Sequence, residues 1–417
     1  MMISLNIENA FSRISKSDFE AQAQQLETFS AQVKERNQGF SSILDDENIL
    51  TQIENFHKNL DPKIESFVIL GIGGSSLGFD AILQAIPSPK GKNFFILNNS
   101  DPEKIFEIEN QIDLAKTLFL VITKSGKTPE TMAQFFYFQE KVLNKKLVQS
   151  SHFVFVTDSD SFLHQLSKKE SIPCFEIPSN VGGRFSVLTA VGLLPSKILG
   201  LNIRKFINGA KKVRTQFLSK NFSQNLPFQL ASLQFLHQKQ QIMQNVLFPY
   251  AGNMKGVGEW FIQLISESTG KTNTAGKSVG ITPLCAVGAK DQHSILQLFS
   301  DGPKDKLFLF LEIESFRQNM HIGTSPCLEL TDFAFLKDKT FGELLHAEFE
   351  GTQKALTEKD CPNITIKIPQ INEESLGALF FLFEASTAFL GEFLNINVFN
   401  QPGVERSKIL TKEILEK

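Results

Sequence analysis

Hydrophobic and polar residues alternate along this chain with two periods, one typical of strands and the other typical of helices. Short apolar runs rich in β-branched and aromatic residues predict strands at 66–70, 94–97, 117–122, 153–157 and 174–177. Between them lie segments with apolar residues three and four positions apart, and 131–143 illustrates this helical period. The repeated order of strand, helix and strand favours right-handed crossovers and a parallel sheet.

The second half of the chain shows the same alternation. It predicts strands near 245–251, 307–312 and 364–368, and helices near 258–268, 341–355 and 376–393. Residues 5–60 carry amphipathic helical patterns instead. We therefore expect an α/β fold of two three-layer αβα sandwich domains, each with a doubly wound, mostly parallel sheet, and with helical N-terminal and C-terminal segments.

A length of 417 residues exceeds the usual size of a single hydrophobic core, which favours two domains. We expect a helical segment at 1–60, a first domain at 61–210 and a second domain at 211–417 that ends in a helix. The polar stretch 219–225 interrupts the pattern near this boundary. Because no low-complexity linker marks the boundary, the domains are expected to pack closely.

Composition narrows the possible functions. The net charge is only −3, which gives no polybasic footprint for nucleic acid. There is no run of 18 apolar residues, so no membrane span is expected. The four cysteines are widely spaced without a CxxC pair, which favours a reducing cytoplasm, and the seven histidines form no metal-binding spacing. We expect no metal and no cofactor.

A glycine-rich loop follows the first predicted strand. Residues 71–78 read Gly-Ile-Gly-Gly-Ser-Ser-Leu-Gly and precede a helix, whose free backbone amides can bind an anion. A dinucleotide-binding fingerprint would need glycine where Ser76 stands, and no Walker lysine follows. The hydroxyls suit a sugar or a phosphate monoester. The alternative is a glycine-rich turn that only lets the helix pack tightly.

A second loop, 123–131, reads Thr-Lys-Ser-Gly-Lys-Thr-Pro-Glu-Thr, with four hydroxyls and two lysines in nine residues. Thr128 is expected to be the N-cap of a helix that starts at Pro129. Hydroxyls and amides together can bind a phosphate monoester. The alternative is an ordinary helix cap beside solvated lysines.

Candidates for proton transfer lie near two helix ends. Glu259, Gln263 and Glu267 fall four apart on the polar face of the helix at 258–268, and Gly270 follows its end. Glu267 thus faces the negative end of the helix dipole, which is poor for stability and useful for a general base. An isolated glutamate would more often be solvated.

His293 is the second candidate. Asp291 is expected to cap a helix that continues with the apolar run at 295–299, so that His293 would lie in its first turn. Histidine is the usual proton donor and acceptor near neutral pH. An isolated histidine at a helix start is more often polar surface.

Two further segments carry charge in unusual settings. Residues 182–186 read Gly-Gly-Arg-Phe-Ser, in which Arg184 can stabilise developing negative charge and Ser186 can cap the next helix. Residues 399–408 read Phe-Asn-Gln-Pro-Gly-Val-Glu-Arg-Ser-Lys, a turn that opens a helix with Lys408 in its second turn. Taken alone, each segment could have a purely structural role. Arg184 could simply pair with a carboxylate, and 399–408 could be a capped terminal helix with a solvated lysine.

The last two segments together resemble the paired signatures of the glucose-6-phosphate isomerase family. Further blocks at 71–78, 123–131, 263–271 and 290–294 follow in the family's order, so the resemblance covers nearly the whole chain. It implies two sugar isomerase (SIS) domains, the first of them binding sugar phosphate. The implied reaction is the reversible aldose–ketose isomerisation of glucose 6-phosphate and fructose 6-phosphate through a cis-enediolate. Thr269 departs from the asparagine that the family more often has there.

The resemblance also implies roles for individual residues. Glu267 would move the proton between C1 and C2, His293 and Lys408 would open the sugar ring, and Arg184 would stabilise the enediolate. Substrate contacts are implied for Gly74, Ser75, Thr123, Lys124, Ser125, Thr128, Gln263 and Gln401. A homodimer is implied too, in which His293 reaches the partner's site.

Three rival functions share some of these features. A non-catalytic SIS-type phosphosugar sensor would use the same loops, but it has no reason to keep Glu267, His293 and Lys408 together. An amino sugar isomerase would show a glutamine-hydrolysing domain, whereas activity on mannose 6-phosphate stays open. A Rossmann dehydrogenase fails at Ser76.

Overall fold

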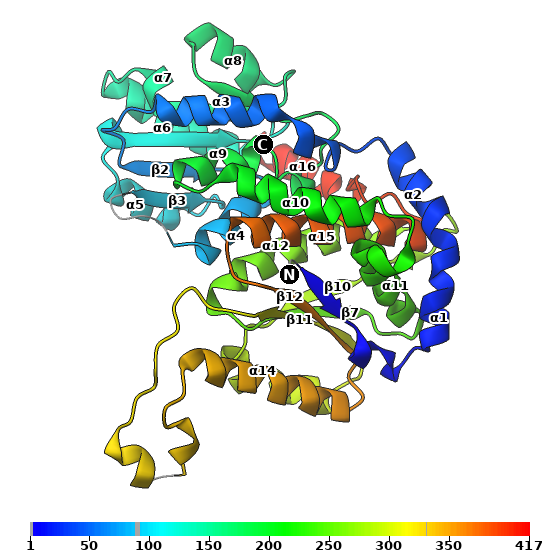
Figure 1. Ribbon diagram of the computed structural model, residues 1–417. Helices are drawn as coiled ribbons and strands as arrows, with labels where there is room; N and C mark the ends of the chain where they lie inside the picture. Colours follow the sequence, from blue (N-terminus) through cyan, green and yellow to red (C-terminus); the bar gives the residue numbers. More distant parts are fainter. Residues whose placement is uncertain (1–2, 88–91, 331) are drawn as a thin grey trace. The chain divides into compact units, whose positions relative to one another are not determined.

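The computed structural model describes residues 3–87, 92–330 and 332–417 (Figure 1). The chain forms two compact units. We call residues 37–211 the middle unit, and residues 1–36 together with 212–417 the outer unit. Helix α10 (Ile203–Phe217) contains the change from one to the other. Residues 1–36 thus join the C-terminal half. The division into domains at 1–60, 61–210 and 211–417 stays a prediction.

The middle unit is built on a five-stranded, wholly parallel sheet. Its strands, in spatial order, are β3 (Asn93–Leu97), β2 (Ser66–Leu70), β4 (Thr117–Ile122), β5 (Phe153–Thr157) and β6 (Cys174–Glu176). All five were predicted from the sequence to within one residue. The three inner strands are buried along their whole length, as expected for parallel strands covered on both faces.

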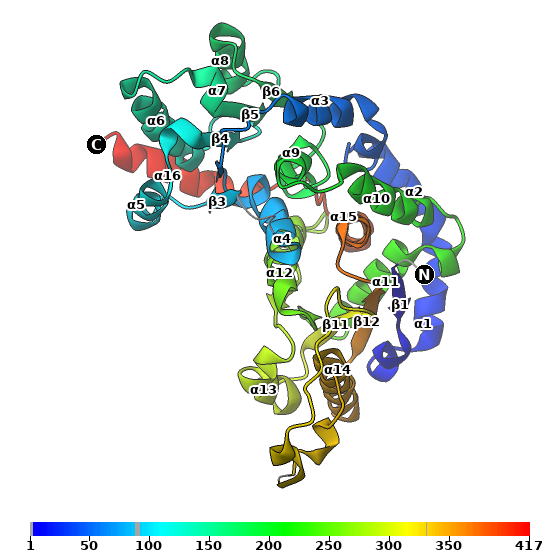
Figure 2. The ribbon, with the colours of Figure 1, turned by 60° about the vertical axis from the view of Figure 1, so that its left-hand side comes forward.

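Helices cover both faces of this sheet (Figure 2). Five of them carry the layers: α5 (Pro102–Gln111), α6 (Pro129–Asn144) and α8 (Phe162–Glu170) on one face, α4 (Leu77–Ala85) and α9 (Ala190–Ile198) on the other. The short α7 (Gln149–His152) leads into β5. Phenylalanines fill the core beneath α6: the ring of Phe153 lies 5.3 Å from that of Phe119, on which it stacks, and 5.3 Å from that of Phe135, which it meets edge to face. This packing fixes the strand ends from which the loops emerge.

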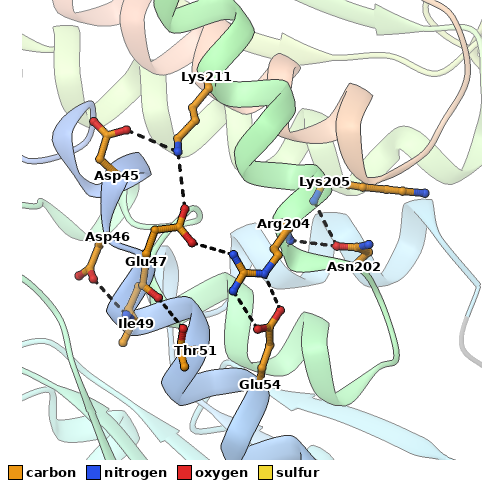
Figure 3. Close-up of polar contacts among 10 residues, drawn as sticks. All are labelled: Asp45, Asp46, Glu47, Ile49, Thr51, Glu54, Asn202, Arg204, Lys205 and Lys211. Carbon is orange, nitrogen blue, oxygen red and sulfur yellow. Dashed lines mark hydrogen bonds and ion pairs between the residues drawn. The ribbon is translucent and has the colours of Figure 1, made fainter.

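A charged cluster joins α3 (Glu47–Lys58) to the start of α10 (Figure 3). Arg204 donates two hydrogen bonds of 2.9 Å to the carboxylate of Glu54 and one of 2.7 Å to Glu47. Lys211 lies 3.5 Å from Asp45 and 3.8 Å from Glu47. Two basic residues therefore bind three carboxylates within the middle unit.

The outer unit also contains a five-stranded sheet. Its strands, in spatial order, are β1 (Ser4–Asn6), β12 (Asn363–Ile368), β11 (Lys306–Ile313), β7 (Gln244–Pro249) and β10 (Thr282–Cys285). The pairs are parallel except that β1 runs antiparallel to β12. The sequence predicted the three central strands and missed both edges. Residues 4–6 form an edge strand, although 5–60 were expected to be helical.

The helices of this unit lie on both faces of its sheet (Figures 1 and 2). One face carries α11 (Leu226–Lys239), α12 (Lys255–Thr269) and α15 (Glu373–Leu394), and the other carries α13 (Leu296–Asp301) and α14 (Phe341–Glu358). The N-terminal helices are α1 (Lys16–Ala21) and α2 (Leu26–Glu35), and α16 (Glu405–Leu415) ends the chain. The expected α/β class with two mostly parallel sheets is confirmed.

Helix α15 is the central helix of the outer unit. Its 22 residues are long and apolar enough to cross a membrane, with a mean hydropathy of 1.4, yet the apolar window is wholly buried inside the protein. A helix that is apolar on all sides is expected when other helices surround it. Near its end Glu392 accepts hydrogen bonds of 2.9 and 3.0 Å from Arg36, which fastens α15 to the end of α2.

Candidate functional site

The glycine-rich loop of the middle unit brings two predicted residues together. After β2 the chain forms a short 3-10 turn, Gly73–Ser75, before α4 begins. A Cβ atom on Gly74 would lie 2.3 Å from the backbone of Gly183 and 2.7 Å from the backbone nitrogen of Arg184. Only glycine permits this approach. The half-buried Ser75 lies beside it.

Arg184 itself is almost completely buried, with 3 % of its surface exposed, and its guanidinium lies 5.6 Å from the centre of the Phe185 ring. The prediction that Ser186 caps the following helix is wrong. Its hydroxyl donates to the carbonyl of Gly183 at 2.6 Å, and Thr189 caps α9 through the amide of Val191. Ser186 therefore helps to hold the turn that carries Arg184.

The loop after β4 carries the hydroxyls expected to bind phosphate. Thr123 is buried, and its hydroxyl lies 3.1 Å from that of Thr128. Pro129 begins α6 and Thr128 occupies the N-cap position, as predicted, but the Thr128 hydroxyl makes no capping hydrogen bond. It pairs with Thr123 instead, which leaves the first amides of α6 without a side-chain cap. Such amides are suited to an anion.

Lys124 has a structural contact that the sequence did not reveal. Its ammonium group donates to the carbonyls of Ser179 at 2.6 Å and Val181 at 2.9 Å. Burial lowers the pKa of Lys124, and nearby Asp158 opposes that shift. The lysine thus ties this loop to the segment that leads to Arg184. Ser125 is exposed, and its hydroxyl accepts from the amide of Lys127 at 3.2 Å.

In the outer unit, Gln263 and Glu267 lie on one face of α12, as predicted. The Gln263 amide donates to the Glu267 carboxylate at 3.2 Å. The opposite face is fixed by aromatic packing, since Trp260 lies 4.8 Å from Phe380 and Phe261 lies 4.9 Å from Phe383, both on α15. The candidate base is therefore held on a rigid helix.

Lys271 is a supporting residue for which no role was predicted from the sequence. Its ammonium group donates to the carbonyls of Glu267 at 2.7 Å and Ser268 at 2.8 Å, just beyond the C-cap Gly270. A lysine after a helix end commonly satisfies the last carbonyls, and this pattern could have revealed the contact. Lys271 stabilises the turn of α12 that carries Glu267.

His293 ends a 3-10 turn (Lys290–His293) and is exposed. The prediction that Asp291 caps the following helix is wrong, because α13 starts only at Leu296 with Ile295 at its N-cap. The Asp291 carboxylate accepts from the amide of Val287 at 2.8 Å instead. Because α13 starts three residues after His293, the histidine lies before the helix rather than in its first turn.

The C-terminal signature forms a 3-10 turn (Pro402–Val404) that leads into α16, with Gln401 at the N-cap position. Lys408 is exposed and forms an ion pair of 2.8 Å with Glu405. A cavity of about 900 Å³ is lined both by Lys271 and by Asn400 and Pro402. The structure therefore brings the end of α12 and the C-terminal signature to one cavity of the outer unit.

The predicted residues divide between the two units. Gly74, Ser75, Arg184 and the loop at 123–128 belong to the middle unit. The outer unit contains the proton-transfer candidates and their neighbours: Gln263, Glu267, His293, Gln401 and Lys408. Among the described residues, no three His, Cys, Asp or Glu side chains gather in a way that could hold a metal ion.

Comparison with known proteins identifies relatives over most of the chain. A family model described as phosphoglucose isomerase matches residues 55–417. A glucose-6-phosphate isomerase of Carboxydothermus hydrogenoformans is 38% identical over 88% of this chain and 82% of its own length. One from Thermus thermophilus is 35% identical over 90% of both chains.

Two solved structures share the fold of this chain. A protein of Thermus thermophilus described as hypothetical superposes with a TM-score of 0.93 and 32% identity over the full length of both chains. A glucose-6-phosphate isomerase of Chlamydia trachomatis has a TM-score of 0.86 and 22% identity, over 99% of this chain and 88% of its own.

The fold class is thus that of the SIS-type phosphosugar isomerases. Two parallel-sheet units, one with a hydroxyl-rich loop at a strand end and one with a carboxylate in the last turn of a helix, are consistent with that class. Within it, the chain belongs to the phosphoglucose isomerase family.

Proposed function

We propose that the protein catalyses the reversible isomerisation of glucose 6-phosphate and fructose 6-phosphate, a step shared by glycolysis and gluconeogenesis. The observation that carries the proposal is the Gln263–Glu267 pair on the rigid face of α12, in a chain whose residues 55–417 match the family model. A carboxylate in this setting can accept a carbon-bound proton. The substrate is inferred from the relatives, which are glucose-6-phosphate isomerases.

In the proposed reaction, His293 and Lys408 open the sugar ring. Glu267 then removes the proton from C2, which gives a cis-enediolate, and returns it to C1. Arg184 stabilises the negative charge on the enediolate oxygens, since a guanidinium donates hydrogen bonds in a fixed planar geometry. Hydrogen moves as a proton in every step, so the chemistry draws on no redox cofactor.

The substrate phosphate is assigned to the loop after β4. The hydroxyls of Thr123, Ser125 and Thr128 would hold it together with the amides at the start of α6, and backbone near Lys124 would assist. The Lys124 ammonium group already contacts two carbonyls, which supports a backbone role rather than a direct ion pair. Gly74, Ser75, Gln263 and Gln401 are assigned to the sugar.

Lys408 must leave Glu405 to act at the ring oxygen. The pair is exposed, with side-chain exposures of 53% and 61%. Exposed ion pairs contribute only about 0–1 kcal/mol, so breaking this one is inexpensive. The resting pair is therefore compatible with a catalytic role for Lys408.

We also infer that the protein is a homodimer in the cytoplasm, with His293 acting in the partner's site. The exposure of His293 supports this arrangement. The segment between β11 and α14 projects from the sheet and exposes Met320, Phe333 and Phe335 by 59%, 56% and 66% (Figure 1). Exposed apolar groups of this size favour association. The free cysteines, one of them exposed, suit a reducing compartment.

The dimer is tested by sedimentation equilibrium of Phe335→Asp and of Phe106→Asp. Both phenylalanines are 66% exposed, but Phe106 lies on α5 of the middle unit. The first substitution should weaken the dimer and the second should not. A wild-type protein that is monomeric at micromolar concentration and fully active would overturn the inference.

The activity is tested by following fructose 6-phosphate consumption, coupled to glucose-6-phosphate dehydrogenase, in wild type and Glu267→Gln. We expect rapid wild-type turnover and a loss of about 10²-fold or more in kcat for the variant, the typical contribution of a general base. Glu259→Gln, on the same helix, is the matched control and should retain activity, because Glu259 pairs with Lys255 instead.

Other outcomes would favour the rivals. A folded wild-type protein that binds the sugar phosphate without turning it over would be a sensor. Comparable turnover of mannose 6-phosphate would make the enzyme a dual phosphoglucose and phosphomannose isomerase. A Glu267→Gln variant with most of its activity would show that another residue is the base.

A further inference from the structure

The residue before His293 is anchored by three oxygens of the outer unit. The side-chain nitrogen of Gln292 lies 2.7 Å from the Tyr250 hydroxyl, 2.7 Å from the Thr352 hydroxyl and 3.2 Å from the backbone carbonyl of Glu348. A carbonyl can only accept a hydrogen bond, so this contact fixes which end of the amide is the nitrogen. The three partners come from the end of β7 and from α14.

The partners are themselves immobilised. Tyr250 is 2% exposed and Thr352 is 6% exposed. The Tyr250 ring lies 5.2 Å from the Phe349 ring on α14 and packs against the backbone at Gly288, where a Cβ atom would be 2.6 Å away. Hydrogen bonds to such buried, packed groups define a position more sharply than bonds to exposed side chains.

The next side chain along the turn, that of His293, lacks such anchoring by any described residue. His293 is exposed, and within residues 3–87, 92–330 and 332–417 its imidazole has no hydrogen bond or ion pair. Its position therefore depends on the backbone of the turn. That backbone is held at Asp291, whose carboxylate accepts from Val287, and at Gln292.

We propose that Gln292 is a positioning residue for His293: its half-buried amide, bonded to buried partners, fixes the turn from which the imidazole projects. The inference rests on the proposed function, because it assigns to His293 the opening of the sugar ring. A displacement of about 1 Å in a catalytic group can cost about 10²-fold in rate. Loss of this anchor should therefore reduce kcat while substrate still binds.

The test begins with Gln292→Met, which keeps the length of the side chain and removes its donors. We expect kcat for fructose 6-phosphate to fall about ten- to hundredfold and KM to change less than about threefold. Binding of an acyclic five-carbon aldonic acid phosphate, which has no ring to open, should stay within about threefold. Gln353→Met is the matched control, because Gln353 on α14 also donates to a threonine hydroxyl, that of Thr365, at 2.5 Å.

The decisive measurement is a double-mutant cycle with His293→Asn. If Gln292 acts only through His293, the double variant should be no slower than His293→Asn alone. A further tenfold loss in the double variant, or a Gln292→Met enzyme as fast as wild type, would overturn the proposal. If Gln292→Met does not fold, Tyr250→Phe and Thr352→Val remove the acceptors one at a time, and their combined effect on kcat decides in the same way.

These results separate the inference from the proposed function. A wild-type protein without isomerase activity, or a His293→Asn variant with full kcat, would contradict the proposed function or the role of His293. An active wild type with a slow His293→Asn and an unaffected Gln292→Met would leave the function standing and reject the positioning role alone.

Discussion

The side-chain nitrogen of Gln263 lies 3.2 Å from a carboxylate oxygen of Glu267, one turn further along α12. The other end of this amide, the Gln263 carbonyl oxygen, is buried and has no hydrogen-bond partner among the described residues. A buried oxygen without a partner is costly unless a ligand supplies a donor. We therefore interpret Gln263 as a bridge that orients the candidate base and accepts a hydrogen bond from a substrate hydroxyl.

Replacement of Gln263 by Leu should lower kcat/KM by about ten- to hundredfold, because a hydrogen bond to a charged group contributes about 1.5–3 kcal/mol. Steady-state kinetics with fructose 6-phosphate measures the effect. Gln297→Leu is the control: it removes the same kind of contact, 2.9 Å to Asp301, on the exposed surface of α13. Equal kinetics for the two variants would refute the bridging role.

The close contact between Gly74 and the backbone of Gly183 predicts that alanine is harmful at position 74 and tolerated at position 183. Gly74→Ala would place a methyl group 2.3 Å from the Gly183 backbone and displace the turn that carries Arg184. Such overpacking costs about 1–3 kcal/mol of stability, and we expect kcat to fall at least tenfold. Gly183→Ala meets no atom within 4 Å and should behave like wild type. Kinetics and thermal unfolding of both variants provide the measurement.

Both sheets were largely predictable because their inner strands are buried on both faces and read as continuous apolar runs. The short edge strands β1 and β10 were missed because Ser-Leu-Asn and Thr-Pro-Leu-Cys contain no continuous apolar run. Helix α12 was predictable in its buried and polar faces because its apolar positions recur at helical spacing. Its contacts with α15 depend on residues more than 100 positions away.

Two capping predictions failed for a common reason. Ser186 and Asp291 have the residue type of an N-cap, but each side chain bonds a competing group nearby. Thr128 does occupy its predicted N-cap position, although its hydroxyl pairs with that of Thr123. Sequence spacing does not show which amide or hydroxyl lies closest in a tight loop. The same limit hid the contacts of Lys124 and Gln292, whose partners lie about 55 and 42–60 residues away.

The cluster around Arg204 predicts a measurable, salt-sensitive coupling in the middle unit. A double-mutant cycle of Arg204→Met and Glu54→Gln should give a coupling free energy of about 0.3–1 kcal/mol between the two side chains. The pair is bidentate, but the arginine side chain is 42% exposed, which limits this energy. Thermal unfolding in low salt and in about 0.5 M NaCl, where exposed charges are strongly screened, should show the coupling fall. The exposed pair Lys220–Glu27, which has a single contact in the described part of the chain, serves as the control. An equally large coupling free energy for this pair would show that the bidentate geometry of Arg204 and Glu54 adds nothing.

Glu384 in the middle of α15 predicts a pH-dependent stability. The residue is completely buried, and neither of its carboxyl oxygens has a partner among the described residues. Burial raises the pKa of Glu384 well above its ordinary value of 4.5. Between that value and the folded-state pKa, the folded protein binds a proton that the unfolded chain has lost, so stability falls as pH rises.

Glu384→Gln removes this titration and nearly keeps the shape of the side chain. The difference in free energy of unfolding between variant and wild type should be smallest near pH 4.5 and should grow in favour of the variant by about 1.4 kcal/mol per pH unit, up to the folded-state pKa. Urea unfolding can be followed through Trp260, the one tryptophan of the chain, whose ring packs against Phe380 and Phe383 of α15. Glu413→Gln, on the exposed α16, should show no such trend. A difference for Glu384→Gln that stays constant from about pH 4.5 to 8 would mean that the carboxyl group titrates alike in the folded and unfolded chain.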